Sequence, residues 1–198
     1  MEKQVREIQT QSVPGAEQLR QELQREKYKR RYRGTLRSTI YALITAAAVA
    51  VLVATLWLPV LQIYGSSMSP TLREGDIVVS VKKNRFQRGD VVAFYYGNKL
   101  LVKRYIAGPG SSVDITEAGD VIVNGEQMEE PYLEKKHLGI CDIELPYQVP
   151  EDHHFLMGDM RETSVDSRSS TVGCISNEEI VGTIVFRVWP LSDFGRVG

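Results

Sequence analysis

The sequence predicts a mainly β protein, in which a complex antiparallel β domain follows a single N-terminal transmembrane α-helix. Two observations carry this prediction. An apolar run without charge occupies residues 38–60, and after Tyr64 the chain changes to short β-branched segments separated by Gly, Asp, Asn and Pro. We expect a basic cytoplasmic tail at 1–37, the transmembrane helix at 38–61 and an extracytoplasmic β-rich domain at 62–198.

The first 37 residues are basic, with ten Lys and Arg against five Glu and few apolar residues. This composition is typical of a solvated tail, with some helix near 17–31. A docking segment for a cytoplasmic partner is the alternative.

The apolar run at 38–60 is long enough, at about 1.5 Å per residue, to cross a hydrocarbon core roughly 30 Å thick. A buried core helix and a cleaved signal peptide are the alternatives, although a signal peptide has a shorter apolar region near residue 1. Basic residues gather before the run, which favours a cytoplasmic N-terminus. We therefore expect a single-pass protein of the cell membrane, in contact with the lipid bilayer, whose helix ends at Pro59.

The expected strands are runs of β-branched and aromatic residues between turn signals. The clearest of them are 77–81, 91–96, 100–106 and 180–189. A hairpin is predicted from 113–115 and 121–123, which are separated by a turn at 117–120.

Composition argues against two classes of partner. Residues 65–198 carry 14 basic and 20 acidic side chains, so nucleic acid is not expected. The sequence has no CxxC or HExxH spacing, so neither a metal nor another cofactor is expected. Cys141 and Cys174 lie in the exported part, where a disulfide is chemically allowed but is not established by the spacing. The oligomeric state stays open.

Ser67 is a candidate nucleophile. It follows the apolar run closely, after Gly65 and Ser66 and before the apolar Met68, which suits an exposed position on a tight turn. A polar linker that leaves the membrane is the alternative.

Lys103 is a candidate general base, because it interrupts an otherwise apolar, strand-like run at 100–106. An ordinary edge lysine is the alternative. Burial would lower the pKa of the amine: at a pKa of about 10.4 roughly one lysine in 2,500 is neutral at pH 7, but near 8 roughly one in ten is. Leu101 and Val102 could supply the desolvation, and an acidic neighbour would oppose it.

A third segment, 158–168, is dense in Asp, Arg and hydroxyl residues. A solvated loop is one interpretation. Asp and Arg also occur two residues apart in it twice, and could form a network of salt bridges and hydrogen bonds beside a reactive centre.

Together these three segments resemble the signature boxes of the bacterial type I signal peptidases, a family with a Ser/Lys dyad that is also called leader peptidase. The boxes are Ser67 to Pro70, Lys103-Arg104 and 158–168, in the family's order after a membrane anchor. The segments 88–92 and 108–110 are similar as well. The resemblance covers essentially residue 38 to the C-terminus, and its specificity lies in the joint match.

The resemblance implies a signal-peptidase-like β fold and a serine endopeptidase that removes signal peptides from secretory preproteins. Ser67 would be acylated, Lys103 would act as base and then acid, and Ser164 would hold the Lys103 amine. The backbone N–H of Ser67 would line the oxyanion hole, and Gly65 falls where some relatives carry a second, hydroxyl donor. The implied supporting network is Asp159, Arg161, Asp166 and Arg168.

The signal peptide would bind as an added strand between the segment before Ser67 and the segment ending at Lys103. The positions that match substrate pockets are Met68, Leu72, Leu101 and Val102, which as core residues would look the same. Met160 and Ser111 depart from the family's usual Asn and Asp. Residues 135–149 could be an insertion without an assigned use.

Other functions remain possible from the sequence. A Ser/His/Asp hydrolase could use His153 or His154 with Asp159 or Asp166. A non-enzymatic relative that assembles surface pilins would be expected to lose the dyad. Self-cleaving repressors and conjugation-associated peptidases also use a Ser/Lys pair, but the first need a DNA-binding domain.

Overall fold

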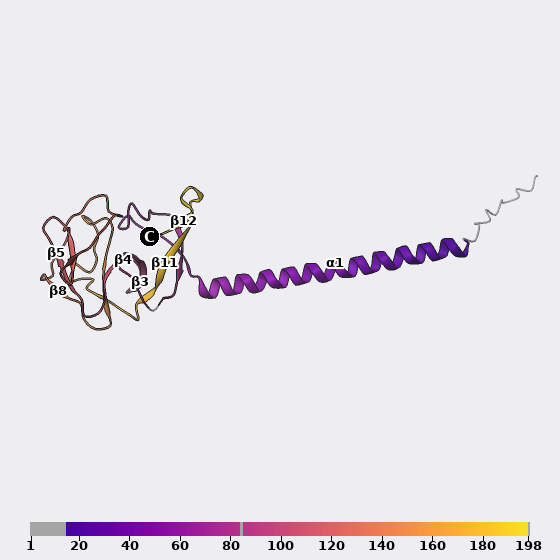
Figure 1. Cartoon of the computed structure of the whole chain (residues 1–198), viewed down its shortest axis with the longest axis horizontal. Helices are drawn as coiled ribbons and strands as arrows, with labels where there is room; N and C mark the ends of the chain where they lie inside the picture. Colours follow the sequence, from indigo (N-terminus) through magenta and orange to yellow (C-terminus); the bar gives the residue numbers. More distant parts are fainter. Residues whose placement is uncertain (1–14, 84, 198) are drawn as a thin grey trace, which may run out of the picture. The chain divides into compact units, whose positions relative to one another are not determined.

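The basic segment and the apolar run form one helix, α1 (Ala16–Trp57) (Figure 1). The computed structural model describes residues 15–83 and 85–197, so the start of the predicted tail, 1–14, lies outside the described residues. The chain divides after Leu52 into two units, and each is described by itself.

Local interactions explain why α1 is continuous instead of beginning at the apolar run. Gln, Glu, Lys and Arg are good helix formers. Ion pairs three residues apart join Glu22 to Arg25 and Glu26 to Lys29. Further along, the Thr45 hydroxyl donates to the carbonyl four residues earlier, so this polar group is satisfied within the helix.

Among the described residues, α1 is the one helix long and apolar enough to cross a membrane, judged by length and composition. It ends at Trp57, two residues before Pro59, where the helix was expected to stop, and four residues before the expected segment boundary at 61. Pro59 cannot donate a backbone hydrogen bond and restricts the residue before it. Val60 already belongs to the strand β1 (Val60–Gln62).

The larger sheet is antiparallel throughout, with β12 paired to β11 beside its main path. The path runs β1, β2 (Ile77–Val81), β11 (Ile180–Trp189), β3 (Val91–Tyr96), β4 (Lys99–Ala107), β9 (His153–Met157) and β10 (Ile175–Ser176), and β12 is Gly195–Arg196. Three of the four clearest expected strands have the predicted bounds, and β4 is one residue longer at each end.

A smaller antiparallel sheet contains the predicted hairpin. Its order is β7 (Glu126–Gln127), β6 (Val121–Val123), β5 (Ser112–Ile115) and β8 (Tyr147–Gln148). A 3₁₀ turn, η1 (Leu191–Asp193), lies between β11 and β12. The expectation of a mainly β, antiparallel domain after one N-terminal apolar helix is confirmed.

Strand β3 shows why the apolar run VVAF at 91–94 forms a strand that is buried on both faces. Alternate side chains of a strand point to opposite faces. Val91 and Ala93 accordingly pack in one apolar cluster, with Met68. Val92 and Phe94 pack in another. Next to β3 lies β4, so Lys103 is carried on a central strand with Val92 as its pairing partner.

Candidate active site

Ser67 lies on a tight turn that follows β1. The turn is closed by backbone hydrogen bonds from Ser69 N–H to the Ser66 carbonyl (2.9 Å) and from Leu72 N–H to the Met68 carbonyl (2.9 Å). The turn begins at Gly65, whose φ of 81° is in the left-handed region that favours glycine. Ser67 itself is half-buried and lines a cleft at the surface.

Lys103 lies in the interior, with 4% of its surface exposed. Its Nζ donates a hydrogen bond of 2.8 Å to Ser164 Oγ. Because the lysine is on a central strand and the serine is on the 158–168 loop, this bond joins two of the three segments that the sequence singled out.

The pKa of Lys103 is lowered from its ordinary 10.5 to about 8, mainly because burial disfavours the ammonium form. Asp166 and Asp159 oppose this and raise the pKa, whereas the charge of Arg168 lowers it. Each of the two carboxylates is bound by a buried arginine. These arginines bring a compensating charge to each acid, so desolvation prevails.

The loop at 158–164 connects the Ser67 turn to the lysine. Met160 N–H donates to the Ser67 carbonyl at 3.0 Å. Gly158 lies so close to both groups that a Cβ there would overlap Ser164 Oγ and would stand 2.7 Å from the Ser67 carbonyl oxygen. The structure therefore brings Ser67, Lys103 and Ser164 to one place, around the glycine that begins the loop.

Only one of the two Asp–Arg spacings in this loop becomes an ion pair. Asp166 and Arg168 bind each other through two hydrogen bonds of 2.8 Å, and both are fully buried. Asp159 instead binds Arg104, through bonds of 2.8 and 2.6 Å. Arg161 binds Glu130, which lies 31 residues away in the sequence. A local Asp159–Arg161 pair is therefore not what the network uses.

The Asp166 carboxylate also accepts the Gly158 N–H at 2.8 Å. Hydrogen bonds and the Arg168 charge hold the pKa of Asp166 below its ordinary value, although burial alone would raise it. The ionised carboxylate thus fixes the glycine that lies between the Ser67 turn and Ser164.

Comparison with known proteins decides the family. The family model described as "Signal peptidase, peptidase S26" matches residues 36–189. This chain belongs to the signal peptidase S26 family. Signal peptidase IB of Staphylococcus aureus strain COL is 36% identical over 152 residues, which are 67% of this chain and 78% of the relative.

Signal peptidase I of Bacillus licheniformis is 33% identical over 147 residues, 68% of this chain and 78% of the relative. A crystal structure of a signal peptidase I from Enterococcus faecalis aligns with 25% identity and a TM-score of 0.41, covering 50% of this chain and 97% of that one. Together the family model and the relatives place the chain among the bacterial type I signal peptidases, which are serine-type hydrolases.

In this signal peptidase, a small cleft of about 40 Å³ opens beside Ser67. It lies between the segment 61–68 and the first half of β4, and Ser67, Met68, Leu101 and Val102 line it. Leu72, the fourth expected pocket residue, does not line it. Its side chain is fully buried and packs in the apolar core with Met68.

Sequence reasoning missed several buried or half-buried residues that support the site. Tyr132 donates its hydroxyl to Glu130 at 3.0 Å, and its ring lies 3.8 Å from the Arg104 guanidinium carbon. Thr71 donates to Asp159 at 2.5 Å and accepts from Arg104 at 3.0 Å. Only Arg104 carried a sequence signal, as the neighbour of Lys103; the others are ordinary residues until the fold assembles them.

The alternative Ser/His/Asp arrangement does not form. His154 Nε2 lies 2.6 Å from the Asn177 amide oxygen, and His153 Nδ1 lies 2.7 Å from the Glu151 carbonyl. The two carboxylates that could have joined a triad are both bound by arginines. Cys141 and Cys174 are free thiols. Within residues 15–83 and 85–197, no group of three or more His, Cys, Asp or Glu side chains is arranged so that it could hold a metal ion.

Proposed function

We propose that this chain removes signal peptides from exported preproteins, with Ser67 as nucleophile and Lys103 as general base. The observation that carries the proposal is the buried amine of Lys103, which is bound to Ser164 and has a pKa lowered to about 8. At this pKa about one Lys103 amine in ten is neutral at pH 7, and a neutral amine can accept the proton of the Ser67 hydroxyl.

The reaction has two halves. The neutral Lys103 amine takes the Ser67 hydroxyl proton while Ser67 Oγ attacks the carbonyl carbon of the scissile peptide bond. The Ser67 N–H, which makes no backbone hydrogen bond with any other described residue, stabilises the oxyanion. The ammonium then gives its proton to the leaving amine, and the mature protein departs. In the second half Lys103 activates a water that hydrolyses the acyl-enzyme.

Ser164 has a positioning role in this scheme. Its hydroxyl accepts a hydrogen bond from the amine without adding a negative charge that would raise the pKa. The ion pairs Asp159–Arg104 and Asp166–Arg168 keep the loop in place and partly offset two nearby carboxylate charges. Arg161 and its partner Glu130 extend the same support.

The small cleft would favour a substrate with small side chains before the cut. The cleft beside Ser67 has a volume of only about 40 Å³, far below the roughly 300 Å³ or more of ordinary ligand sites, so large side chains would not fit in it. An extended signal peptide would lie between the 61–64 segment and the residues at 100–102 that line this cleft. Gly65 offers no side-chain donor there, so the backbone supplies the oxyanion contact.

In the cell we place α1 across the membrane, with the basic segment in the cytoplasm and the β domain outside, where preproteins emerge. The basic residues before the apolar stretch support this orientation. Protease added to intact spheroplasts should digest the β domain; protection until the cells are lysed would contradict the orientation.

The dyad is tested with detergent-solubilised full-length protein and a purified preprotein. Ser67→Ala and Lys103→Arg should each abolish cleavage, the first because the nucleophile is removed and the second because a guanidinium cannot give up its proton. The near-ultraviolet circular dichroism of both variants should stay like that of the wild type. Lys99→Arg makes the same change at an exposed residue of the same strand and should remain active. Activity of Lys103→Arg close to the wild type would remove the general-base role.

A further inference from the structure

A second cleft lies next to the nucleophile turn, separate from the small cleft that would receive the signal peptide. It has a volume of about 270 Å³, and Ser69 and Pro70, directly after the nucleophile and Met68, form part of its wall. Met160 and Glu162 of the 158–168 loop form another part, and the segment 134–137 forms the rest. None of the residues around this cleft lines the small cleft at 61–68 and 100–102.

The two clefts are reached from the two ends of the Ser67 turn. Residues at 61–68, up to and just past the nucleophile, line the first cleft, whereas those at 69–70 line the second. The hydrogen bond from Met160 N–H to the Ser67 carbonyl connects the second cleft directly to the nucleophile. The residues just before and just after Met68 therefore line two different clefts.

Hydrogen bonds and close packing hold the segment 134–137 in a fixed position relative to the 158–168 loop. Arg168 donates to the Leu138 carbonyl at 2.5 Å and to the Ser164 carbonyl at 3.3 Å, so one guanidinium holds both. Gly139 packs so closely that a Cβ would overlap the Arg161 carbonyl. At the other end, Lys136 forms an ion pair with Asp120 at 2.6 Å. These contacts hold the 134–137 side of the cleft firmly against the residues around Ser164.

The charges around the cleft differ in their partners. Asp159 and Arg161 are buried in the ion pairs already described, and Lys136 is bound to Asp120. The remaining charged side chains, Glu134, Lys135 and Glu162, are exposed and form no ion pair with any residue in the described part of the chain. They are free to interact with a bound chain.

We infer that this second cleft receives the first residues of the mature protein, on the leaving side of the scissile bond, and that Glu134, Lys135 and Glu162 sense their charge. The inference rests on the proposed peptidase function. It gives a use to the beginning of the 135–149 segment: a wall for the leaving chain. A volume slightly under the 300 Å³ or so of small ligand sites suits one or two residues of an extended chain.

The test uses three peptides that are identical up to the scissile bond. One continues with Lys at its second and third positions, one with Glu at both, and the third ends in an aminocoumarin that leaves nothing to fill the cleft. Cleavage of the coumarin peptide by the wild type establishes that the proposed function holds. For each variant, kcat/KM for the Lys and Glu peptides is divided by that for the coumarin peptide.

Glu162→Lys should lower the ratio of Lys-peptide to Glu-peptide cleavage by about two- to fivefold, the range for exposed ion pairs. Lys135→Glu should raise the same ratio by a similar factor. Added salt should weaken both changes. The opposite signs from two neighbouring positions distinguish contact with the leaving chain from a general change in activity.

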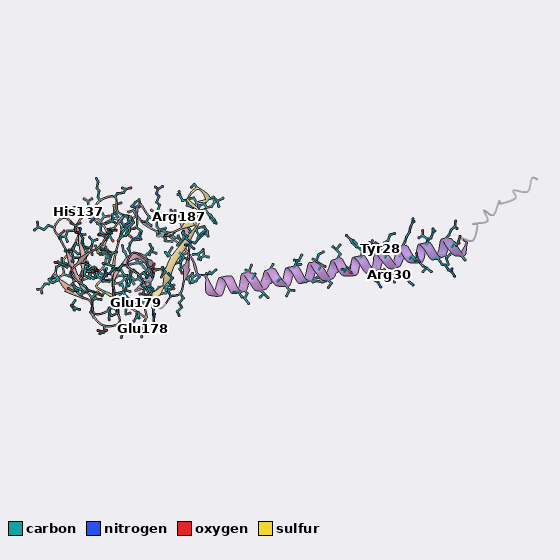
Figure 2. All side chains as sticks on the ribbon, in the orientation of Figure 1. Tyr28, Arg30, His137, Glu178, Glu179 and Arg187 are labelled. Carbon is teal, nitrogen blue, oxygen red and sulfur yellow. The ribbon has the colours of Figure 1, made fainter. Side chains whose placement is uncertain are left out.

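Glu178→Lys is the matched control. It makes the same charge change at an exposed glutamate outside the cleft, and Figure 2 shows Glu178 and His137 at opposite edges of the globular unit in that view. If Glu162→Lys and Lys135→Glu leave the ratio as it is in Glu178→Lys, while the coumarin peptide is still cleaved, the leaving-side assignment is wrong and the proposed function stands. No cleavage of any of the three peptides by the wild type overturns both.

Discussion

The pH dependence of cleavage reports directly on the protonation of Lys103. With a pKa of about 8 for the amine, the neutral fraction is about 0.09 at pH 7, 0.5 at pH 8 and 0.9 at pH 9. If the neutral amine is the base, kcat/KM should rise about fivefold from pH 7 to 8, about twofold from 8 to 9 and then level off. A solvated lysine with a pKa of 10.5 would give about tenfold at each step, without a plateau.

The assay is the initial rate of cleavage of a fluorogenic signal-peptide substrate that carries no group titrating between about pH 6 and 10. His154 and Cys174 do not confuse the result, because burial lowers the pKa of the first below its ordinary 6.5 and raises that of the second to about 11. A rate that climbs tenfold per pH step through pH 10 would refute the claim that burial prepares Lys103. So would a midpoint near 6.5 that disappears when both His153 and His154 are replaced.

Three substitutions test the physical basis of the site. Lys103→Met should be inactive but about 3 kcal/mol more stable to urea at pH 7, because the wild type must keep a charged lysine buried, which lowers its pKa from 10.5 to about 8. This gain in stability should shrink as the pH rises from about 8 to 10.5, because the folded wild type then holds a neutral lysine and, near 10.5, the unfolded chain loses the same proton. Gly158→Ala should lower kcat strongly, because its Cβ would displace the Ser164 hydroxyl. Glu130→Gln should cost about 3 to 5 kcal/mol in the same unfolding assay, because the Arg161 guanidinium stays buried without a counter-charge.

Each of these substitutions has a control at a matched position. Lys99→Met and Glu178→Gln make equivalent changes at exposed residues and should leave stability within about 0.5 kcal/mol. Gly195→Ala adds a Cβ where no other atom lies within 4 Å. The electrostatic account fails if Lys103→Met is no more stable than Lys99→Met at pH 7. Normal turnover by Gly158→Ala would mean that the loop relaxes away from the added carbon.

The local sequence pattern was sufficient to predict the main strands and to single out the serine, lysine and Asp/Arg-rich loop as candidate site residues. The strands at 77–81, 91–96 and 180–189 follow from runs of β-branched and aromatic residues, whose preference acts over near neighbours. The six strands that sequence reasoning missed include β10 and β12, of two residues each, which are too short for a periodic signal and exist because a neighbouring strand offers hydrogen bonds.

By itself, the sequence determined the apolar helix, the antiparallel β class and which serine, lysine and loop belong to one family. Only the tertiary structure decided that Asp159 binds Arg104, that Arg161 binds Glu130 and that Leu72 is buried in the core. The reason is that the ion-pair partners are 55 and 31 residues apart. Which charges meet across such separations depends on which strands become neighbours, and no local preference encodes that adjacency. The fall in the pKa of Lys103 has the same origin, since burial comes from the packed strands on either side of β4.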